Sequence, residues 1–392
     1  MNIIYASSYI ERKYFYSLFS EREFMPGQQV QKYHHLLVNG LKKNFNVHIK
    51  VISSLPINSL NYDKRIISSN KIYSGNLTYK HFFTFNIKFI KNISDFLNGF
   101  FEVIFVKKEL DTVVIADVLH ISVTAGALLA CKLRGILAVG IVTDLPRNLS
   151  ENNASIKINN KIASFFDSYL FLTKAMNTVI NKYNKPYLVL EGHVDSEMDS
   201  VDNILDDKEN VKVCIYAGNK KKIYGIECLV KSFIKADVKD SELHIYGDGD
   251  FKTELLRYVG IYSNIKYFGV VDNDCVVEAE IKATLLINPR PSHDEYTWYS
   301  FPSKNMEYMV SGTPVLTTKL PGMPKDYYDY VYLIETETVE GMSRTISSLL
   351  NKSKEELHQF GMKAKAFVLN EKNNVNQAGK VIGLIKDSLY AN

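Results

Sequence analysis

The chain is poor in cysteine: its 392 residues include only four. These cysteines are scattered and form none of the paired spacings that are typical of metal sites. Scattered cysteines without a pairing pattern predict free thiols in a reducing compartment. We therefore expect a cytoplasmic protein. The four are Cys131, Cys214, Cys228 and Cys275.

The chain also lacks a strong charge excess and long apolar runs. Lys and Arg number 47 against 43 Asp and Glu, whereas a nucleic-acid binder would show a larger or more clustered excess. Its most apolar stretch, residues 115–133, is interrupted by His, Asp and Lys and is too short for a membrane span. The first residues turn polar by residue 11, unlike a signal peptide. We expect no nucleic-acid partner; contact with the inner face of a membrane stays open.

What the sequence does contain is a regular alternation of strand-like and helix-like segments. In the first half, β-branched runs alternate with amphipathic segments, a pattern typical of parallel sheets covered by helices. The predicted strands are 1–7, 46–54, 112–117, 136–144 and 168–173, and the predicted helices are 26–43 and 125–135.

A second series of the same kind follows the acidic stretch 202–211. Two α/β domains are the simplest organisation, and we place them at residues 1–204 and 205–375, with a last helix from about residue 376 to 392. The predicted strands are 212–218, 242–247, 265–271, 283–289 and 313–318, and the predicted helices are 226–236, 251–260 and 301–312.

Ligands of open parallel sheets bind at the carboxyl ends of the strands. Two such domains facing each other would form a cleft, so functional residues are sought first at strand ends. The segment TWYSFPSKNMEYMVSGTPVLTT (297–318) places a short helix between two strand-like runs. Pro302 suits the first turn of this helix, and Ser300 is a candidate cap.

This helix carries two charges one turn apart. Its amino terminus, with Ser303 and Lys304, is suited to a phosphate group. Glu307 lies on the same face, where its carboxylate can accept hydrogen bonds from sugar hydroxyls. The pair predicts a nucleoside diphosphate site. The alternative is a surface ion pair worth a few tenths of a kcal/mol, at about equal weight on spacing alone.

Two glycine turns are further candidates. Gly218 ends a strand in YAGNKKKIYGIECLVKSF and is followed by Asn219 and three lysines, of which Lys220 and Lys222 are donor-site candidates. The lysine that would face a diphosphate is not decided by the sequence. Gly27 opens the helix at 26–43 and permits close approach of a ligand, although a plain helix-start turn explains it equally well.

Other polar residues follow strands as well. His120 and Asp144 follow strands of the first domain, where they are candidates for handling an acceptor hydroxyl, but a structural role explains each at least as well. The acidic triplets at 248–250 and 272–274 resemble metal-binding carboxylates, but Asp and Gly after a strand more often form turns. We favour turns and expect no metal site.

The stretch KHFFTFNIKFIKN (80–92) interleaves basic and aromatic residues. This composition is typical of an interfacial membrane segment. Because it does not resolve into one helical face, a helix packed against the core is an equal alternative.

Taken together and in their order along the chain, these segments resemble those of the GT-B glycosyltransferases, specifically the retaining family four. The resemblance spans nearly the whole chain and is strongest from 213 to 334. The blocks that carry it are YAGNKKKIYGI, LHIYGDGD, IKYFGVV, LLINPRPSHDE, FPSKNMEYMVSGTPVLTT and YVYLIE, with MPGQQ, VTDLP, LTKAMNTVINKY and LEGHVD in the first half.

The resemblance implies roles for several residues. Glu307 matches the second glutamate of the family's Glu-x7-Glu motif, which binds the donor ribose. Tyr299 stands eight positions before Glu307, where the motif has its first glutamate. Glu295 matches the sequence context of that first glutamate, but eleven residues, and not seven, separate it from Glu307. The family's arginine and lysine near the first glycine turn correspond to Asn219 and Tyr224, so the neighbouring lysines and Lys304 would have to supply that charge.

The implied fold is two Rossmann-like domains with parallel sheets facing across a deep cleft. The implied activity is a hexosyltransferase-type, metal-independent transfer of a sugar, with retention, from a UDP- or GDP-linked donor. The implied acceptor is a glycan or a polyprenyl-linked glycan in bacterial polysaccharide biosynthesis, and the last helix would pack back on the first domain. Alternatives are a nucleotide-sugar epimerase of the same fold and a non-catalytic nucleotide-sugar-binding protein.

Overall fold

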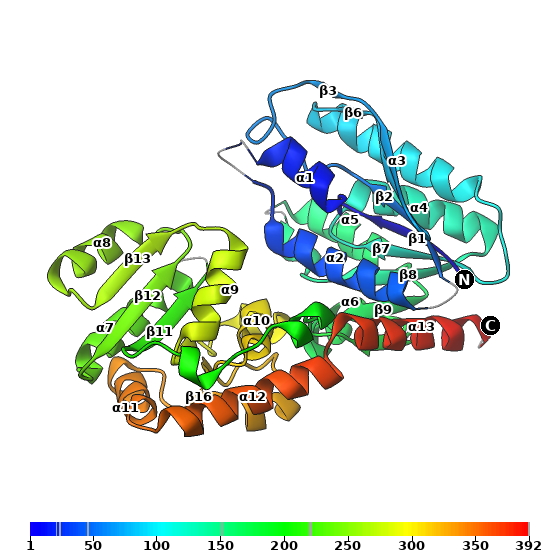
Figure 1. The fold of residues 1–392 in the computed structure, drawn as a ribbon. Coiled ribbons are helices and arrows are strands. Elements are labelled where there is room, and N and C mark those ends of the chain that lie inside the picture. Colours follow the sequence, from blue (N-terminus) through cyan, green and yellow to red (C-terminus); the bar gives the residue numbers. More distant parts are fainter. Residues whose placement is uncertain (21, 23–24, 45–46, 150–151, 219–221, 391–392) are drawn as a thin grey trace. The chain divides into compact units, whose positions relative to one another are not determined.

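The computed structural model describes residues 1–20, 22, 25–44, 47–149, 152–218 and 222–390 (Figure 1). The chain divides into two units: unit 1 is Met1–His193 with Asn374–Asn392, and unit 2 is Val194–Asn373. The division thus falls after His193 and not at the predicted 204/205. The reason is that Asn203 donates from Nδ2 to the carbonyl oxygen of Ser311 at 2.7 Å, which ties this segment to unit 2.

Unit 1 is built on a mostly parallel sheet, whose described strands run in the order β10-β9-β8-β7-β1-β2-β5-β4. Its central strands are continuous apolar runs buried along their whole length, as expected for a parallel sheet covered on both faces. Among the described strands of this sheet, only β4 pairs antiparallel, with β5. The strands are β1 (Asn2–Ser7), β2 (His48–Ser53), β4 (Asn70–Ser74), β5 (Leu77–His81), β7 (Thr112–Asp117), β8 (Leu137–Val142), β9 (Ser168–Phe171) and β10 (Tyr187–Val189).

Seven α-helices are found among the described residues of unit 1, and the helix predicted at 26–43 is confirmed as α2. The last helix, α13, packs on α2. A Cβ atom at Gly40 would lie 2.0 Å from the carbonyl oxygen of Asn374, so only glycine allows this approach. The helices are α1 (Arg12–Phe19), α2 (Gln28–Lys43), α3 (Lys88–Ile104), α4 (Ile121–Arg134), α5 (Asn153–Ala163), α6 (Lys174–Ile180) and α13 (Asn374–Tyr390).

The stretch 80–92 is not one helix, so the alternative of a single helix packed against the core is wrong, whereas contact with a membrane interface stays a prediction. Strand β5 ends at His81, β6 (Thr84–Phe85) pairs antiparallel with β3 (Ile66–Ile67), and α3 begins only at Lys88. Burial alternates, with Phe82 and Thr84 buried and Phe83 exposed. A period of two is the signature of an extended chain, which is why no single helical face could be found.

Unit 2 contains a parallel sheet with the strand order β13-β12-β11-β14-β15-β16 in the described residues. All five strands predicted in this half are confirmed, and β16 is added at the edge. The strands are β11 (Lys212–Ala217), β12 (Ser241–Tyr246), β13 (Ile265–Gly269), β14 (Leu285–Asn288), β15 (Val315–Thr318) and β16 (Tyr332–Ile334). The helices are α7 (Ile226–Ala236), α8 (Lys252–Ile261), α9 (Asn273–Lys282), α10 (Ser303–Ser311), α11 (Val339–Leu350) and α12 (Lys354–Glu371).

Short 3-10 helices complete the described structure. They are η1 (Pro146–Leu149), η2 (Ser196–Ser200), η3 (Leu205–Asp207), η4 (Lys222–Tyr224), η5 (Glu295–Tyr299) and η6 (Lys325–Tyr330). Within the part of the chain that the structure describes, no helix combines the length and the apolar character needed to cross a bilayer.

His81, the last residue of β5, is fully buried, and both of its ring nitrogens lack a hydrogen-bond partner among the described residues. Its ring stacks on that of Tyr14, with 4.8 Å between the ring centroids. Burial lowers the pKa of His81 to about 4. The native state therefore holds this imidazole neutral at pH values where an exposed histidine is protonated.

We expect acid to destabilise the protein through His81. Between pH 7 and pH 5 the unfolded chain, with a histidine pKa of about 6.5, binds a proton that the native state does not, so stability falls by about 2 kcal/mol. The variant His81→Phe, which keeps a ring between its neighbours, should lose this part of the pH dependence. Urea unfolding at the two pH values measures it. The exposed His48 provides the control variant His48→Phe; equal pH dependence in both variants would refute the role of His81.

Candidate functional site

Four of the residues predicted to bind a donor lie in or beside the first two turns of α10 in unit 2: Gly218, Ser303, Lys304 and Glu307. This helix begins at Ser303, two residues later than the predicted start at 301, with Pro302 as its N-cap and no side-chain cap. The predicted cap, Ser300, instead accepts a long hydrogen bond of 3.4 Å from Nη1 of Arg290. The backbone N–H groups of the first turn are thus not covered by a side chain, which suits an anionic ligand.

Hydrogen bonds tie α10 to the carboxyl ends of two central strands. The hydroxyl group of Tyr308 accepts from the backbone N–H of Ala217 at 2.8 Å and lies 3.2 Å from its carbonyl oxygen. Asn305 accepts at Oδ1 from Nδ2 of Asn288 at 2.7 Å. Because Ala217 ends β11 and Asn288 ends β14, the residues that follow these strands are held near the start of the helix.

Lys304 and Glu307 form an ion pair of 2.9 Å between Nζ and Oε2, and both side chains stay partly exposed. Burial alone would lower the pKa of Lys304, but the carboxylates of Glu307 and Glu280 outweigh it, and the pKa is raised. Lys304 is therefore held in its charged form. The ion pair described as the alternative does form; it does not exclude a ligand, because both groups remain partly accessible.

Gly218 lies beside this pair. A Cβ atom added to it would be 3.7 Å from Cε of Lys304, an ordinary contact, so the glycine turn and the lysine are neighbours. Asn219 and Lys220 lie outside the described residues. Lys222 is engaged with other partners: its ammonium group pairs with Glu254 at 2.7 Å, and its backbone N–H donates to Asp250.

Arg290, which sequence reasoning missed, follows β14 after one intervening residue, Pro289. Its guanidinium carbon lies 4.7 Å from the ring centroid of Tyr224 and 5.7 Å from that of Tyr296. Its Nε is buried without a hydrogen-bond partner, and no carboxylate of the described residues forms an ion pair with it. Tyr224 occupies a position where the resemblance implies a positive charge, so an arginine from another strand end supplies charge next to it. Its place directly after a predicted strand was the signal that could have found it.

The loop with Glu295 is folded rather than open. Glu295 begins η5 and is exposed, and Tyr299 ends it. Thr297 between them is buried and donates from Oγ1 to the carbonyl oxygen of Asp294 at 2.6 Å. The extra residues of this loop therefore form an anchored turn.

The two acidic triplets have the roles of turns and caps. Asp248 accepts from the backbone N–H of Gly249 at 3.0 Å, and Asp272 is the N-cap of α9. Across the described residues, no group of three or more His, Cys, Asp or Glu side chains is arranged to hold a metal ion. Metal independence remains a prediction.

Two of the three candidate residues of unit 1 line a cavity of about 570 Å³ at the carboxyl ends of its strands. Gly27, the N-cap of α2, and His120, the N-cap of α4, both line it. A Cβ atom at Gly27 would meet only Val30, at 3.7 Å, so packing does not require a glycine here. Asp144 is not among the described residues that line the cavity; its carboxylate accepts from the backbone N–H of Leu145 at 2.8 Å.

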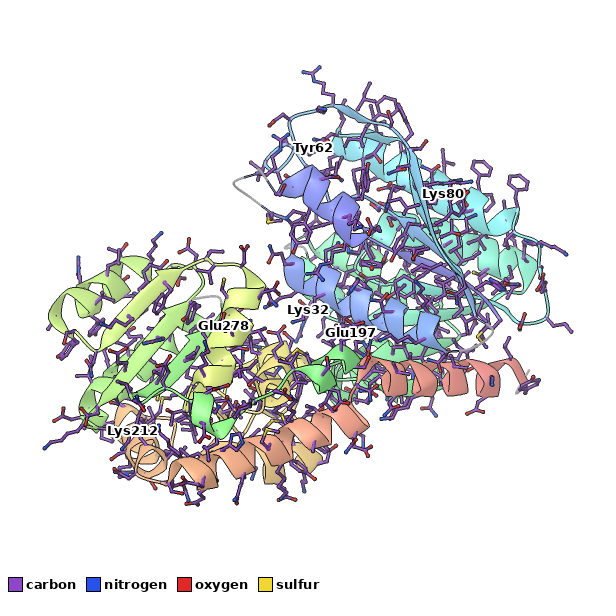
Figure 2. The ribbon with its side chains drawn as sticks, viewed as in Figure 1. Lys32, Tyr62, Lys80, Glu197, Lys212 and Glu278 are labelled. Atoms are coloured by element: carbon purple, nitrogen blue, oxygen red, sulfur yellow. The ribbon has the colours of Figure 1, made fainter. Side chains whose placement is uncertain are left out.

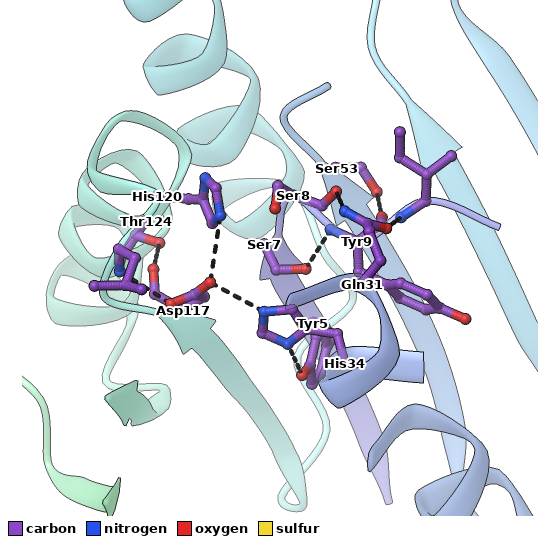
Figure 3. Close-up of polar contacts among 12 residues, drawn as sticks. Tyr5, Ser7, Ser8, Tyr9, Gln31, His34, Ser53, Asp117, His120 and Thr124 are labelled. Atoms are coloured by element: carbon purple, nitrogen blue, oxygen red, sulfur yellow. Dashed lines mark hydrogen bonds and ion pairs between the residues drawn. The ribbon is translucent and has the colours of Figure 1, made fainter. Parts of the chain in front are cut away.

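A buried network of polar contacts that includes Asp117, His34 and Tyr5 lies next to His120 (Figure 3). Oδ2 of Asp117 lies 3.4 Å from Nε2 of His120 and 3.0 Å from Nε2 of His34. Nδ1 of His34 lies 2.6 Å from the hydroxyl oxygen of Tyr5. A carboxylate only accepts, so Nε2 of His34 carries a hydrogen and donates it to Asp117.

The charges of this network are set by its burial. Burial alone would raise the pKa of Asp117, but His120, His34 and the backbone N–H of Leu119 outweigh it, and the pKa is lowered. Burial lowers the pKa of His120, against the opposing effect of Asp117. An ionised Asp117 beside a neutral His120 leaves this histidine able to act as a proton acceptor.

The cavity wall also carries a second polar group. Lys91 donates to Oγ of Ser54 at 2.8 Å and to Oδ2 of Asp95 at 2.9 Å. Ser54 and Lys91 line the cavity, whereas Asp95 is buried behind them. Ser54 in turn donates its own hydroxyl hydrogen to Oδ2 of Asp95 at 2.6 Å. Of these side chains, the ammonium group of Lys91 therefore keeps a hydrogen-bond donor for the hydroxyl groups of a small polar molecule.

The match to a protein family lies within unit 2. Residues 211–352 match the family model "Glycosyl transferases group 1". No curated protein sequence matches the chain. The matched segment contains the candidate donor residues of α10 and Arg290.

Solved structures resemble the chain over nearly its whole length. One is sucrose-phosphate synthase from Thermosynechococcus elongatus, with a TM-score of 0.68, 12% identity and 100% of each chain covered. Another is HepE from Anabaena in complex with UDP, with a TM-score of 0.65, 10% identity, and 99% of this chain and 100% of that chain covered. A third is the lipopolysaccharide outer core galactosyltransferase WaaB, with a TM-score of 0.64, 14% identity and 99% of each chain covered. The predicted GT-B fold class is confirmed, and together with the family match these similarities support a glycosyltransferase.

Proposed function

We propose that the protein transfers a sugar from a nucleoside diphosphate sugar to an acceptor hydroxyl, retaining the configuration at the anomeric carbon. The observation that carries the proposal is the convergence of Lys304, Glu307 and Arg290 at the strand ends of unit 2. Two cations and an uncapped helix terminus suit a diphosphate, and a carboxylate one turn further suits vicinal ribose hydroxyls.

The same groups account for the chemistry without a metal. As the bond between sugar and diphosphate breaks, negative charge grows on the leaving phosphate oxygens. Arg290 and Lys304 stabilise that charge, and preorganised electrostatic stabilisation of this kind is usually the main contribution to catalysis. A front-face attack, with the leaving phosphate accepting the acceptor's proton, requires no enzyme nucleophile.

The acceptor would bind in the cavity of unit 1. His120 lines this cavity and contacts Asp117, and Lys91 adds a hydrogen-bond donor on its wall. A glycan hydroxyl is the substrate class these groups suit. We further propose a polyprenyl-linked glycan acceptor at the cytoplasmic face of the membrane, in keeping with the resemblance to bacterial transferases.

A thermal-shift panel of nucleoside diphosphate sugars tests the proposal. A specific donor at about one hundred times its Kd should stabilise the protein by about 2.7 kcal/mol, which is a shift of several degrees in Tm. Slow release of nucleoside diphosphate in the presence of that donor should accompany it. Free sugars and nucleoside monophosphates are the controls. Stabilisation without turnover would favour a non-catalytic binding protein, an epimerised donor would favour an epimerase, and no stabilisation by any donor would refute a donor site.

A further inference from the structure

Helix α3 turns its apolar side outward. In most surface helices the apolar stripe faces the core. In α3 the buried positions are Asp95, Gly99 and Val103, whereas large apolar side chains at a spacing of about one turn are exposed. The exposed side chains are Phe89, Ile90, Ile93, Leu97 and Phe101, and they continue into Phe105 just after the helix.

Helix α4 extends this apolar surface, because the two backbones lie in direct contact. A Cβ atom at Gly99 would lie 2.2 Å from the carbonyl oxygen of Val123, and one at Gly126 would lie 2.0 Å from that of Phe96. Two exposed leucines, Leu129 and Leu133, follow one turn apart on α4. We call the exposed side chains of α3, with Phe105, Leu129 and Leu133, the α3–α4 surface.

The acidic residues of α3 are neutralised within unit 1. Asp95 is buried and paired with Lys91 at 2.9 Å. Glu102 is paired with both Lys50 and Lys80, and Figure 2 shows Lys80 on the neighbouring strand. The helix therefore presents no unpaired carboxylate beside its exposed apolar stripe.

Basic residues lie at both ends of the surface. Lys88 begins α3, and Lys107 and Lys108 follow it, all three exposed. Lys132, next to Leu133, is also exposed and pairs with Asp167 at 2.5 Å. Exposed phenylalanines at each end, with Phe89 at 74% and Phe105 at 80% of full exposure, complete a pattern of aromatic and aliphatic side chains bordered by lysines. This is the composition of a segment that lies in the interface of an anionic bilayer.

A second copy of the chain would be a poorer occupant. Pairing this surface with itself would bring the lysines at its ends toward one another, and like charges oppose association. An anionic lipid bilayer can bury the exposed apolar side chains and at the same time attract the lysines. We propose that the α3–α4 surface docks the protein on an anionic lipid bilayer. This inference deepens the proposed function by naming the surface through which a lipid-linked acceptor would be reached, and it rests on that function only for the acceptor.

Flotation of the full chain with vesicles tests the proposal, without donor or acceptor. The protein should float with phosphatidylglycerol–phosphatidylcholine vesicles and much less with phosphatidylcholine alone. The double variant Phe89→Ser/Phe101→Ser should bind at least about tenfold more weakly, because two exposed rings no longer enter the interface. Lys88→Glu/Lys107→Glu should weaken binding to the anionic vesicles and reduce its dependence on salt.

The matched control is Ile261→Ser/Val270→Ser, which removes two exposed apolar side chains from unit 2 and should bind like the unaltered protein. Equal binding of the phenylalanine variant and this control would overturn the proposal. So would the absence of vesicle binding together with a dimer in sedimentation velocity that the phenylalanine variant dissociates. Release of nucleoside diphosphate in vesicle-free solution is measured in parallel: turnover without vesicle binding refutes only the surface, and vesicle binding without turnover refutes only the proposed function.

Discussion

Replacing Glu307 by alanine lowers the affinity for the nucleoside diphosphate product by about 10- to 100-fold, while Tm stays nearly unchanged. The expected loss corresponds to about 1.5–3 kcal/mol for hydrogen bonds to a charged group, at 1.4 kcal/mol for each factor of ten. The fold should tolerate the change, because a partly exposed ion pair such as that with Lys304 contributes less than about 1 kcal/mol. Isothermal calorimetry gives the affinity, with the nucleotide that stabilises the protein most.

The ligand series makes this experiment specific to the ribose. If Glu307 binds ribose hydroxyls, its loss should weaken the nucleoside and the nucleoside diphosphate by the same factor, since both carry the ribose. Glu307→Gln, which keeps hydrogen-bonding groups without the charge, should lie between the two. Glu278→Ala removes another helical glutamate with a lysine partner, Lys282 at 2.7 Å, and should bind nucleotide normally. Unchanged affinity in Glu307→Ala would remove Glu307 from the site.

The strands and several helices were predictable from the sequence because they carry strong local patterns. Strands β7 and β8 are continuous apolar runs, and at that length such a run between turn residues indicates a strand buried on both faces. Gly312, with a positive φ of 81°, ends α10 where the sequence predicts it. The segment around β3 to β6 was missed, because its strands are short and irregular and tertiary pairing decides them.

The candidate site was predictable only in part, for a related reason. Lys304 and Glu307 are one turn apart in one helix, so their proximity follows from the spacing alone. The contact of Arg290 with Tyr224 joins positions that are far apart in the sequence, and only the neighbouring placement of β11 and β14 brings them together. The same limit applies to Lys222, whose partner Glu254 belongs to another helix. Pairings between elements depend on the sheet order, which local patterns do not encode.

Arg290 gives the second large expected effect: Arg290→Ala should lower kcat by about 100-fold or more and leave nucleoside affinity unchanged. A cation aimed at charge that develops during the reaction contributes about 3–4 kcal/mol to the transition state, by analogy with other preorganised stabilising groups. Affinity for the nucleoside diphosphate should also fall, because the guanidinium contacts only phosphate in this assignment. This separates Arg290 from Glu307, whose loss should weaken both ligands equally.

Arg290→Lys distinguishes charge from geometry. Lysine keeps the positive charge but loses the planar group that lies over Tyr224 and Tyr296, so activity should be restored only in part. Arg257→Ala, at an exposed position of α8, is the matched control and should retain full turnover. Full activity of Arg290→Ala would show that Lys304 and the amino terminus of α10 stabilise the charge of the diphosphate without Arg290. A fall in nucleoside affinity equal to that for the diphosphate would instead assign Arg290 to holding the tyrosine rings in place, because a phosphate contact cannot act on a ligand that has no phosphate.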